Sequence, residues 1–160
     1  MVSPVSRLGL LLGKLFPYSL LATFELLFVI LAGHLIFDVP FAGSFLLLMV
    51  LAVPFILAAL AMGLLISTFA QNQAQALQMT MLTVMPSILL SGYIAPRDTL
   101  PGPLLILSYL FPVTHFMQIV RGIMVRGADF SDVFPSVAYL IILTAVLLTA
   151  ATMRFRKTTE

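Results

Sequence analysis

The sequence contains no cysteine, and only 9% of its 160 residues are charged. The lack of cysteine excludes disulfide bonds, thiolate nucleophiles and zinc sites built on cysteine. Soluble domains carry about a quarter charged residues, so the shortage of charge excludes an ordinary soluble domain. It also excludes a nucleic-acid-binding surface, because the pI of about 9.3 rests on only eight lysines and arginines.

Residue patterns for catalysis and nucleotide binding are missing as well. The two histidines lie far apart in the sequence, and no paired carboxylates, catalytic triad or metal-ligand spacing accompanies them. The segment GLLLGK at residues 9–14 is not a phosphate-binding loop, because the glycines of that loop stand further apart and a Ser or Thr follows its lysine. We therefore predict a chain that is not an enzyme and has no catalytic residue, metal ligand or cofactor of its own.

Long apolar runs dominate the chain, which is 61% hydrophobic with a mean hydropathy of +1.15. A helix needs about 20 apolar residues to cross a bilayer. Four segments approach or exceed this length, namely residues 16–37, 45–69, 76–94 and 133–153. The sequence therefore predicts an all-α integral membrane protein, in which residues 1–160 form a single transmembrane domain with four transmembrane helices.

A further apolar region, residues 100–127, is interrupted by Pro112 and carries Arg121. Neither side of the proline supplies the roughly 20 apolar residues that a crossing requires. The region is therefore predicted to form a re-entrant helical hairpin that enters and leaves the outer leaflet. In this shallow position Arg121 is expected to reach the outer headgroups or an acid such as Asp129.

Residues 1–15 precede the first predicted span. Ser3 is a candidate N-cap and Pro4 suits the first position of a helix, so we predict a short amphipathic helix along the membrane face. The two charges of this helix, Arg7 and Lys14, are both basic. These residues leave open the function of a lipid anchor, in which the basic side chains meet anionic headgroups.

Basic residues also predict the orientation of the chain in the membrane. Arg7 and Lys14 lie near one end of the sequence, and the other end carries Arg154, Arg156 and Lys157. Cytoplasmic segments of membrane proteins are enriched in lysine and arginine. Both termini are therefore predicted to be cytoplasmic, which requires that the hairpin does not cross.

Polar and small residues inside the predicted spans are few. Glu25 is the one ionisable residue in the middle of the first span, where a carboxylate is costly unless it is protonated or paired. Two interpretations stay open for this side chain, a functional site facing protein or water and a neutral or paired residue that fixes packing. In the second span Ala59, Gly63 and Ser67 recur at helical spacing, which predicts a face where another backbone packs closely.

Four motifs extend over most of the chain. The more specific pair is LSGYIAP at residues 90–96 and LSYLFPVTHFMQIVRGIMVRG at residues 107–127, and upstream lie SPVSRLGLLLGKLFPY and GLLISTFAQNQAQALQ. Together these motifs resemble the C-terminal part of the permease subunits of type 2 ABC exporters. In that family a membrane helix, an extracytoplasmic domain and a second helix precede the motifs, and we expect these parts to be absent from this chain.

The resemblance implies a permease of an ATP-driven exporter of the multidrug-efflux kind, in the bacterial inner membrane. A separate ABC ATPase would bind the ATP, and two permeases would pair as a homodimer or heterodimer among the membrane lipids. The implied substrate is hydrophobic or amphipathic, either drug-like, a lipid or a glycan-lipid. The implied ATPase-coupling helix contains Arg7, Leu8, Leu11, Leu12 and Lys14. The implied outer gate, in and before the hairpin, contains Ser91, Gly92, Pro96, Pro112, Arg121 and Gly122.

Two other functions stay open. One is a truncated membrane fragment that does not transport. The other is a proton-coupled secondary transporter that uses Glu25, although such proteins usually have an internal repeat and further intramembrane acids.

Overall fold

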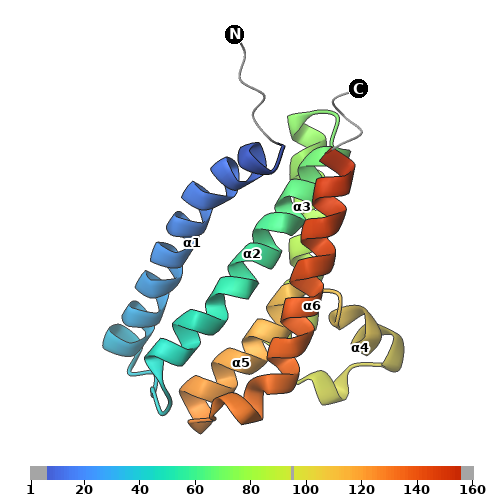
Figure 1. Cartoon of the computed structure of the whole chain (residues 1–160). Helices are drawn as coiled ribbons and strands as arrows, with labels where there is room; N and C mark the ends of the chain where they lie inside the picture. The colour runs from blue at the N-terminus through green and yellow to red at the C-terminus, as the bar shows by residue number, and fades with distance from the viewer. Residues whose placement is uncertain (1–6, 95, 156–160) are drawn as a thin grey trace. The chain divides into compact units, whose positions relative to one another are not determined.

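The computed structural model describes the backbone of residues 7–94 and 96–155, and their side chains except those of residues 7–12, 14, 154 and 155. Within these ranges the structure is all helical and contains no strand, which confirms the predicted fold class. The helices are α1 (Arg7–Phe37), α2 (Phe45–Phe69), α3 (Gln73–Leu90), α4 (Gly102–Ser108), α5 (Pro112–Arg126) and α6 (Phe130–Phe155), and Arg97–Thr99 forms a short 3-10 helix (Figure 1). The chain divides after Val39 into two compact units.

The first unit consists of α1, which runs through Pro17 without a break. The structure differs here from the predicted division into a separate helix at residues 1–15 and a span at residues 16–37. A proline removes one backbone donor, and continuing the helix leaves fewer unpaired backbone groups in an apolar environment than ending it would. Asp38 then takes a left-handed conformation with φ of 50°, and the amide of Val39 donates to the carbonyl of Gly33 at 3.2 Å.

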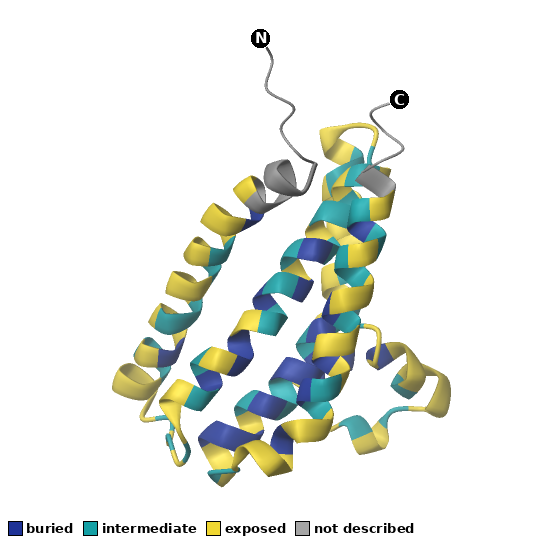
Figure 2. Ribbon diagram, viewed as in Figure 1, coloured by how far each residue is buried: buried dark blue, intermediate teal, exposed yellow. Residues whose placement is uncertain are grey.

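The second unit is a bundle in which α2 packs against α6 and α5, and α5 packs against α6 (Figure 1). Figure 2 shows buried residues in dark blue along α2, α5 and α6. Leu48, Ile119, Ile123 and Leu140 are among them. Lipid chains are as apolar as these side chains, so association of membrane helices depends on close packing more than on removal of apolar surface from water. The buried alanines of α2 allow that close approach, and they are Ala52, Ala58 and Ala61.

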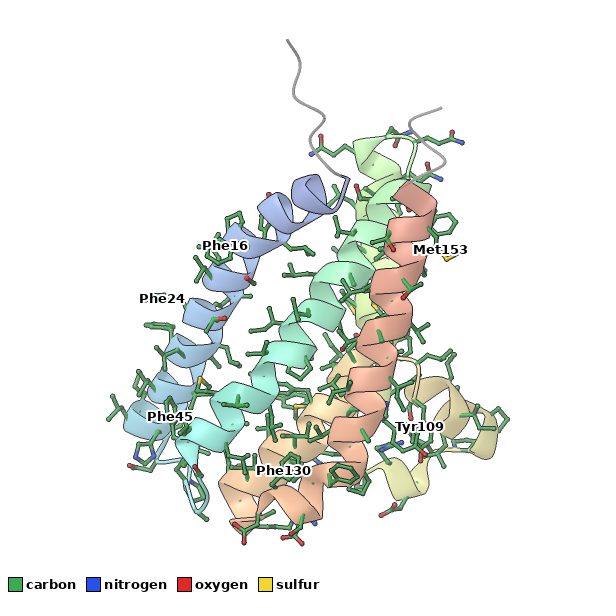
Figure 3. All side chains as sticks on the ribbon, in the orientation of Figure 1. Phe16, Phe24, Phe45, Tyr109, Phe130 and Met153 are labelled. Atoms are coloured by element: carbon green, nitrogen blue, oxygen red, sulfur yellow. The ribbon has the colours of Figure 1, made fainter. Side chains whose placement is uncertain are left out.

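Among the described residues three helices are long and apolar enough to cross a membrane, and their spans are Leu15–Phe37, Phe45–Phe69 and Phe130–Met153. A fourth candidate arises if the bent pair of α4 and α5 counts as one span. Large apolar side chains are exposed along the three spans, and Figure 3 shows examples at Phe16 and Phe24 of α1. The chain is thus a membrane protein, as predicted. The predicted span at residues 76–94 is not among the three, because the helix in this region has a polar, glutamine-rich beginning.

The helix α3 begins earlier and ends earlier than the span predicted at residues 76–94. Asn72 caps its start, since the side chain of Asn72 accepts a hydrogen bond from the amide of Gln75 at 2.8 Å. The helix ends at Leu90, and Gly92 takes a left-handed conformation with φ of 83°. Its 18 residues have a length of about 27 Å, close to the thickness of about 30 Å of a bilayer core. A crossing by α3 therefore stays a prediction.

A buried hydroxyl joins α2 to α6 beside Pro54, the proline within α2. Thr144 is buried, and its hydroxyl lies 2.9 Å from the carbonyl oxygen of Pro54 and 2.7 Å from that of Leu140. One hydroxyl hydrogen is shared between these two acceptors. The contact fixes the register of the two helices at the height of the proline.

The helices α4 and α5 meet at a bend of 85°. With 7 and 15 residues they are about 10 and 22 Å long, so each is shorter than the bilayer core. Figure 1 shows them near the end of the second unit that lies opposite the C-terminal end of α6. This bent pair covers the region of the predicted hairpin, and its path through the membrane stays a prediction.

The C-terminal end of α5 is attached to the loop before α2. The amide of Ala42 donates to the carbonyl of Met124 at 2.9 Å. A Cβ atom on Gly43 would lie 2.5 Å from the carbonyl oxygen of Ile123, so glycine is required for this approach. Gly127 ends α5 in a left-handed conformation with φ of 63°.

Candidate functional site

The corner between α4 and α5 is built around His115, which is 2% exposed. Its Nε2 atom lies 3.0 Å from the carbonyl oxygen of Tyr109, the residue that ends α4. The imidazole stacks on the ring of Tyr139 of α6, with centroids 5.5 Å apart and planes inclined by 15°. The rings of Tyr109 and Tyr139 are 5.9 Å apart. His115 thus connects both helices of the bent pair to α6; Figure 3 labels Tyr109 of this corner.

Arg97 attaches the loop before α4 to the same corner. Its guanidinium carbon lies 4.6 Å from the ring centroid of Tyr109, within the range of a cation–π contact. One terminal nitrogen of Arg97 donates to the hydroxyl of Ser108 at 3.2 Å, and this hydroxyl donates to the carbonyl of Leu105 at 2.6 Å. Ser108 is fully buried. The polar groups of the corner are therefore held in one arrangement.

Arg121 connects α5 to the end of α3. Its Nη2 atom donates to the carbonyl oxygen of Gly92 at 2.7 Å. Of the two partners expected for Arg121, Asp129 is not the one found, because position 121 on α5 lies beside the end of α3 while Gly127 turns the chain away into α6. The amide of Asp129 instead donates to the carboxylate of Asp132 at 3.2 Å. Contact of Arg121 with the outer headgroups stays a prediction.

A polar cavity of about 530 Å³ lies between the end of α3, the following loop and α5. Its lining consists of Ser91, Gly92, Pro96, Arg97, Asp98, Met117, Gln118, Arg121, Val125 and Arg126. Four of the six predicted gate residues line it, namely Ser91, Gly92, Pro96 and Arg121. The structure thus brings these four residues together at one cavity. Their role as a gate that opens and closes a transport pathway stays a prediction.

The other two predicted gate residues lie elsewhere. Pro112 begins α5 and lines a different, apolar cavity. Gly122 is buried against α6, where an added Cβ atom would lie 2.9 Å from the Cγ1 atom of Val133. Gly122 is therefore a position of close helix packing.

The apolar cavity has a volume of about 340 Å³ and lies between α2, α3 and the start of α5. Ala59 and Gly63 line it, and a Cβ atom on Gly63 would have no neighbour within 4 Å. No backbone of the described residues packs closely at Gly63, so the predicted packing of another backbone on this face stays a prediction. The hydroxyls of Thr80 and Thr83 donate to carbonyls of their own helix, so they add no free donor to the wall.

Glu25 lies within the candidate span Leu15–Phe37 and is exposed on α1. In the part of the chain that the structure describes, its carboxylate has no hydrogen bond or ion pair. A carboxylate in a span is costly unless it finds a proton or a partner. Both interpretations of Glu25 therefore stay open.

The predicted ATPase-coupling residues begin α1, whose backbone is described from Arg7 onward. Their side chains lie outside the described residues, and they are those of Arg7, Leu8, Leu11, Leu12 and Lys14. Among the described side chains no group of three His, Asp or Glu residues could hold a metal ion.

Sequence reasoning missed His115, Tyr109, Ser108, Arg97 and Tyr139. It set His115 aside because His34, the other histidine, is distant, but the partners of His115 are a backbone carbonyl and a tyrosine of α6. The sequence signal for this corner was the motif YLFPVTH at residues 109–115, in which a tyrosine, a proline and a histidine stand three positions apart. Nothing in the sequence near this motif indicates Tyr139.

Comparison with known proteins places this arrangement in a family. Residues 1–153 match the family described as ABC-2 family transporter protein. The chain is 34% identical over 157 residues to the probable multidrug ABC transporter permease YbhR of Escherichia coli strain K12, an alignment that covers 98% of this chain and 43% of the relative. It is 36% identical over 124 residues to the probable multidrug ABC transporter permease YbhS of the same strain, covering 77% and 33%.

A third relative is the inner membrane transport permease YhhJ of the same strain, 28% identical over 159 residues, or 99% of this chain and 42% of the relative. The chain thus spans less than half the length of these relatives. No solved structure matches it. The match over residues 1–153 and the membrane-spanning helices both indicate a membrane transport protein. The chain belongs to the ABC-2 family of transporter proteins, as a membrane part of a transport permease.

Proposed function

We propose that this chain forms the C-terminal membrane portion of a permease in an ATP-driven exporter of hydrophobic or amphipathic molecules. The observation that carries the proposal is the apolar cavity between α2, α3 and the start of α5. Its volume of about 340 Å³ falls in the range of small-molecule sites. Because Phe111 and Pro112 of the corner line it, a movement of the bent pair would change its shape.

Filling the cavity tests this proposal. Leucine in place of Gly63 adds a side chain where no atom lies within 4 Å of the Cβ position, so the helix should still fold. The full-length permease with its partner ATPase is compared with the Gly63→Leu variant for ATP-dependent export of amphipathic dyes such as ethidium and rhodamine 6G. We expect export to fall at least severalfold at equal protein level.

The matched control is Gly102→Leu, because Gly102 also has open space around its Cβ position but does not line the cavity. This variant should export the dyes normally. Normal export by Gly63→Leu would exclude the cavity as the substrate path. Failure of the unmodified permease to export any dye of the panel would contradict the proposed substrate class.

The ATP in this mechanism belongs to a separate ABC ATPase, which we propose docks on the start of α1. The support is the continuity of α1 from Arg7 to Phe37, since a helix without a flexible linker transmits a displacement at one end to the other. The docking side chains would be Leu8, Leu11 and Leu12, flanked by Arg7 and Lys14. The cytoplasmic location of both chain termini and the bacterial inner membrane belong to the same proposal.

The permease would work as a homodimer or heterodimer, with the pathway enclosed between two subunits. The support is the apolar surface that the helices expose, including Leu82 of α3 at 75% and Leu46 of α2 at 73%. Such surface fits either lipid or another membrane helix.

A further inference from the structure

The polar cavity beside α5 concentrates positive charge in a chain that has little charge of any kind. Three of the eight basic residues line it, and they are Arg97, Arg121 and Arg126. Asp98 is the one acidic residue in the lining. The lining therefore carries an excess of two positive charges.

The arginines are not neutralised by carboxylates within the described residues, where no ion pair involves them. Arg121 donates to a neutral carbonyl, that of Gly92. Arg97 donates to the neutral hydroxyl of Ser108, and its Nε atom is buried without a hydrogen-bond partner. Since a guanidinium has five N–H donors, most donors of these side chains are unused. Positive side chains that lack a carboxylate partner and keep unused donors favour the binding of an anion.

A further donor at the cavity is held by a side chain of α6. The hydroxyl of Ser136 donates to the Oε1 atom of Gln118 at 2.7 Å. The amide NH₂ group of Gln118 therefore remains available to donate, and Gln118 lines the cavity. Planar guanidinium groups with fixed amide donors match the oxygens of a phosphate, which they can bind through paired hydrogen bonds.

Apolar side chains border the same cavity. Met117 and Val125 belong to its lining, and Val125 is 60% exposed. Tyr93 and Ile94 follow Gly92 directly and are 67% and 63% exposed. Such an apolar border gives no binding energy to a free inorganic anion. It does favour an anion that carries acyl chains, because the chains can cover the apolar side chains.

We propose that this cavity binds the phosphate headgroup of an anionic amphiphile, with Arg97, Arg121 and Arg126 around the phosphate and the chains on the apolar border. The volume of about 530 Å³ is large enough for a headgroup rather than a lone ion. The site is separate from the apolar cavity and holds its ligand whether or not the permease transports.

The test measures binding without ATP. Full-length permease is purified in dodecyl maltoside, and phosphatidylglycerol binding is followed by native mass spectrometry, with phosphatidylcholine as the neutral comparison and inorganic phosphate as the competitor. Arg126→Gln removes one charge from a side chain that makes no hydrogen bond in the described structure, so folding should be kept. We expect it to weaken phosphatidylglycerol binding about tenfold, the loss of one charge-assisted hydrogen bond.

Two matched variants make the result specific. Asp98→Asn removes the one acid of the lining and should tighten binding. Arg154→Gln removes a positive charge near the C-terminal end of α6, about 27 Å along the helix from Ser136, which contacts Gln118 of the cavity, and should leave binding unchanged. Equal affinities for all three variants would overturn the proposal. Equal affinity for phosphatidylcholine, or displacement by inorganic phosphate as effective as by the lipid, would overturn the assignment to an anionic amphiphile.

Discussion

The part-buried hydrogen bond of His115 leads to a prediction that can be compared with a second histidine in the same chain. In the His115→Phe variant the ring volume and most of the stacking on Tyr139 are kept, but the donor to the Tyr109 carbonyl is lost. The phenyl ring at the buried position 115 would keep water from this side of the carbonyl, and a carbonyl left without its partner costs about 1–3 kcal/mol. For a chain of this size 1 kcal/mol shifts the melting temperature by about 3 °C, so we expect a loss of roughly 3–9 °C.

His34 provides the matched control. Its Nδ1 atom lies 3.0 Å from the carbonyl of Val39, the same distance as in the His115 bond, but this contact is exposed. In His34→Phe the carbonyl can bind water or lipid headgroups instead, so the cost should stay below about 0.5 kcal/mol. The two variants thus differ in burial and not in the length of the lost bond.

The measurement is the temperature at which half of the detergent-solubilised protein aggregates, determined by size-exclusion chromatography after heating. Because the chain has no cysteine, Ser108→Cys adds a single thiol at a fully buried position of the same corner. This thiol should react faster with maleimide when His115→Phe is also present. Equal temperature losses for both histidine variants, or an unchanged thiol rate, would refute the argument that the corner depends on the bond between His115 and Tyr109.

Three further predictions concern other parts of the chain. Gly122→Ala places a methyl group 2.9 Å from Val133 and should cost about 1–3 kcal/mol of stability in the same heating assay, and a neutral result would mean that α5 and α6 can separate there. Glu25→Gln should lower ATP-dependent dye export at unchanged expression, and normal export would leave Glu25 only a packing role. Leu11→Asp should abolish co-purification of the partner ATPase with the full-length permease, whereas Arg7→Lys should weaken it less. Retention of the ATPase by Leu11→Asp would contradict docking at this helix.

Local features of the chain could be predicted from the sequence. The second span at residues 45–69 coincides with α2, because Ser44 can cap an apolar run and a polar segment follows it. The break at Pro112 was also visible, since proline favours the first turn of a helix. Both features depend on residues that are close together in the sequence.

Long-range contacts could not be predicted in the same way. The bond from Arg121 to Gly92 joins residues 29 positions apart, and its acceptor is a backbone atom that has no signature in the sequence. The contact of His115 with Tyr139 depends on how α5 packs on α6. The continuity of α1 through Pro17 was missed because the cost of a proline had to be compared with the cost of ending a helix in an apolar environment.

The attachment of α5 to the loop before α2 limits how the corner can move. The amide of Ala42 holds the carbonyl of Met124, and the space at Gly43 admits no side chain. The C-terminal end of α5 is therefore joined to the loop before α2, while its N-terminal half is held by the stacking of Phe116 on Phe55 of α2 and of His115 on Tyr139 of α6. A shift of α2 relative to α6 would therefore act on α5 at both of its ends, and the corner with α4 would move together with these two helices.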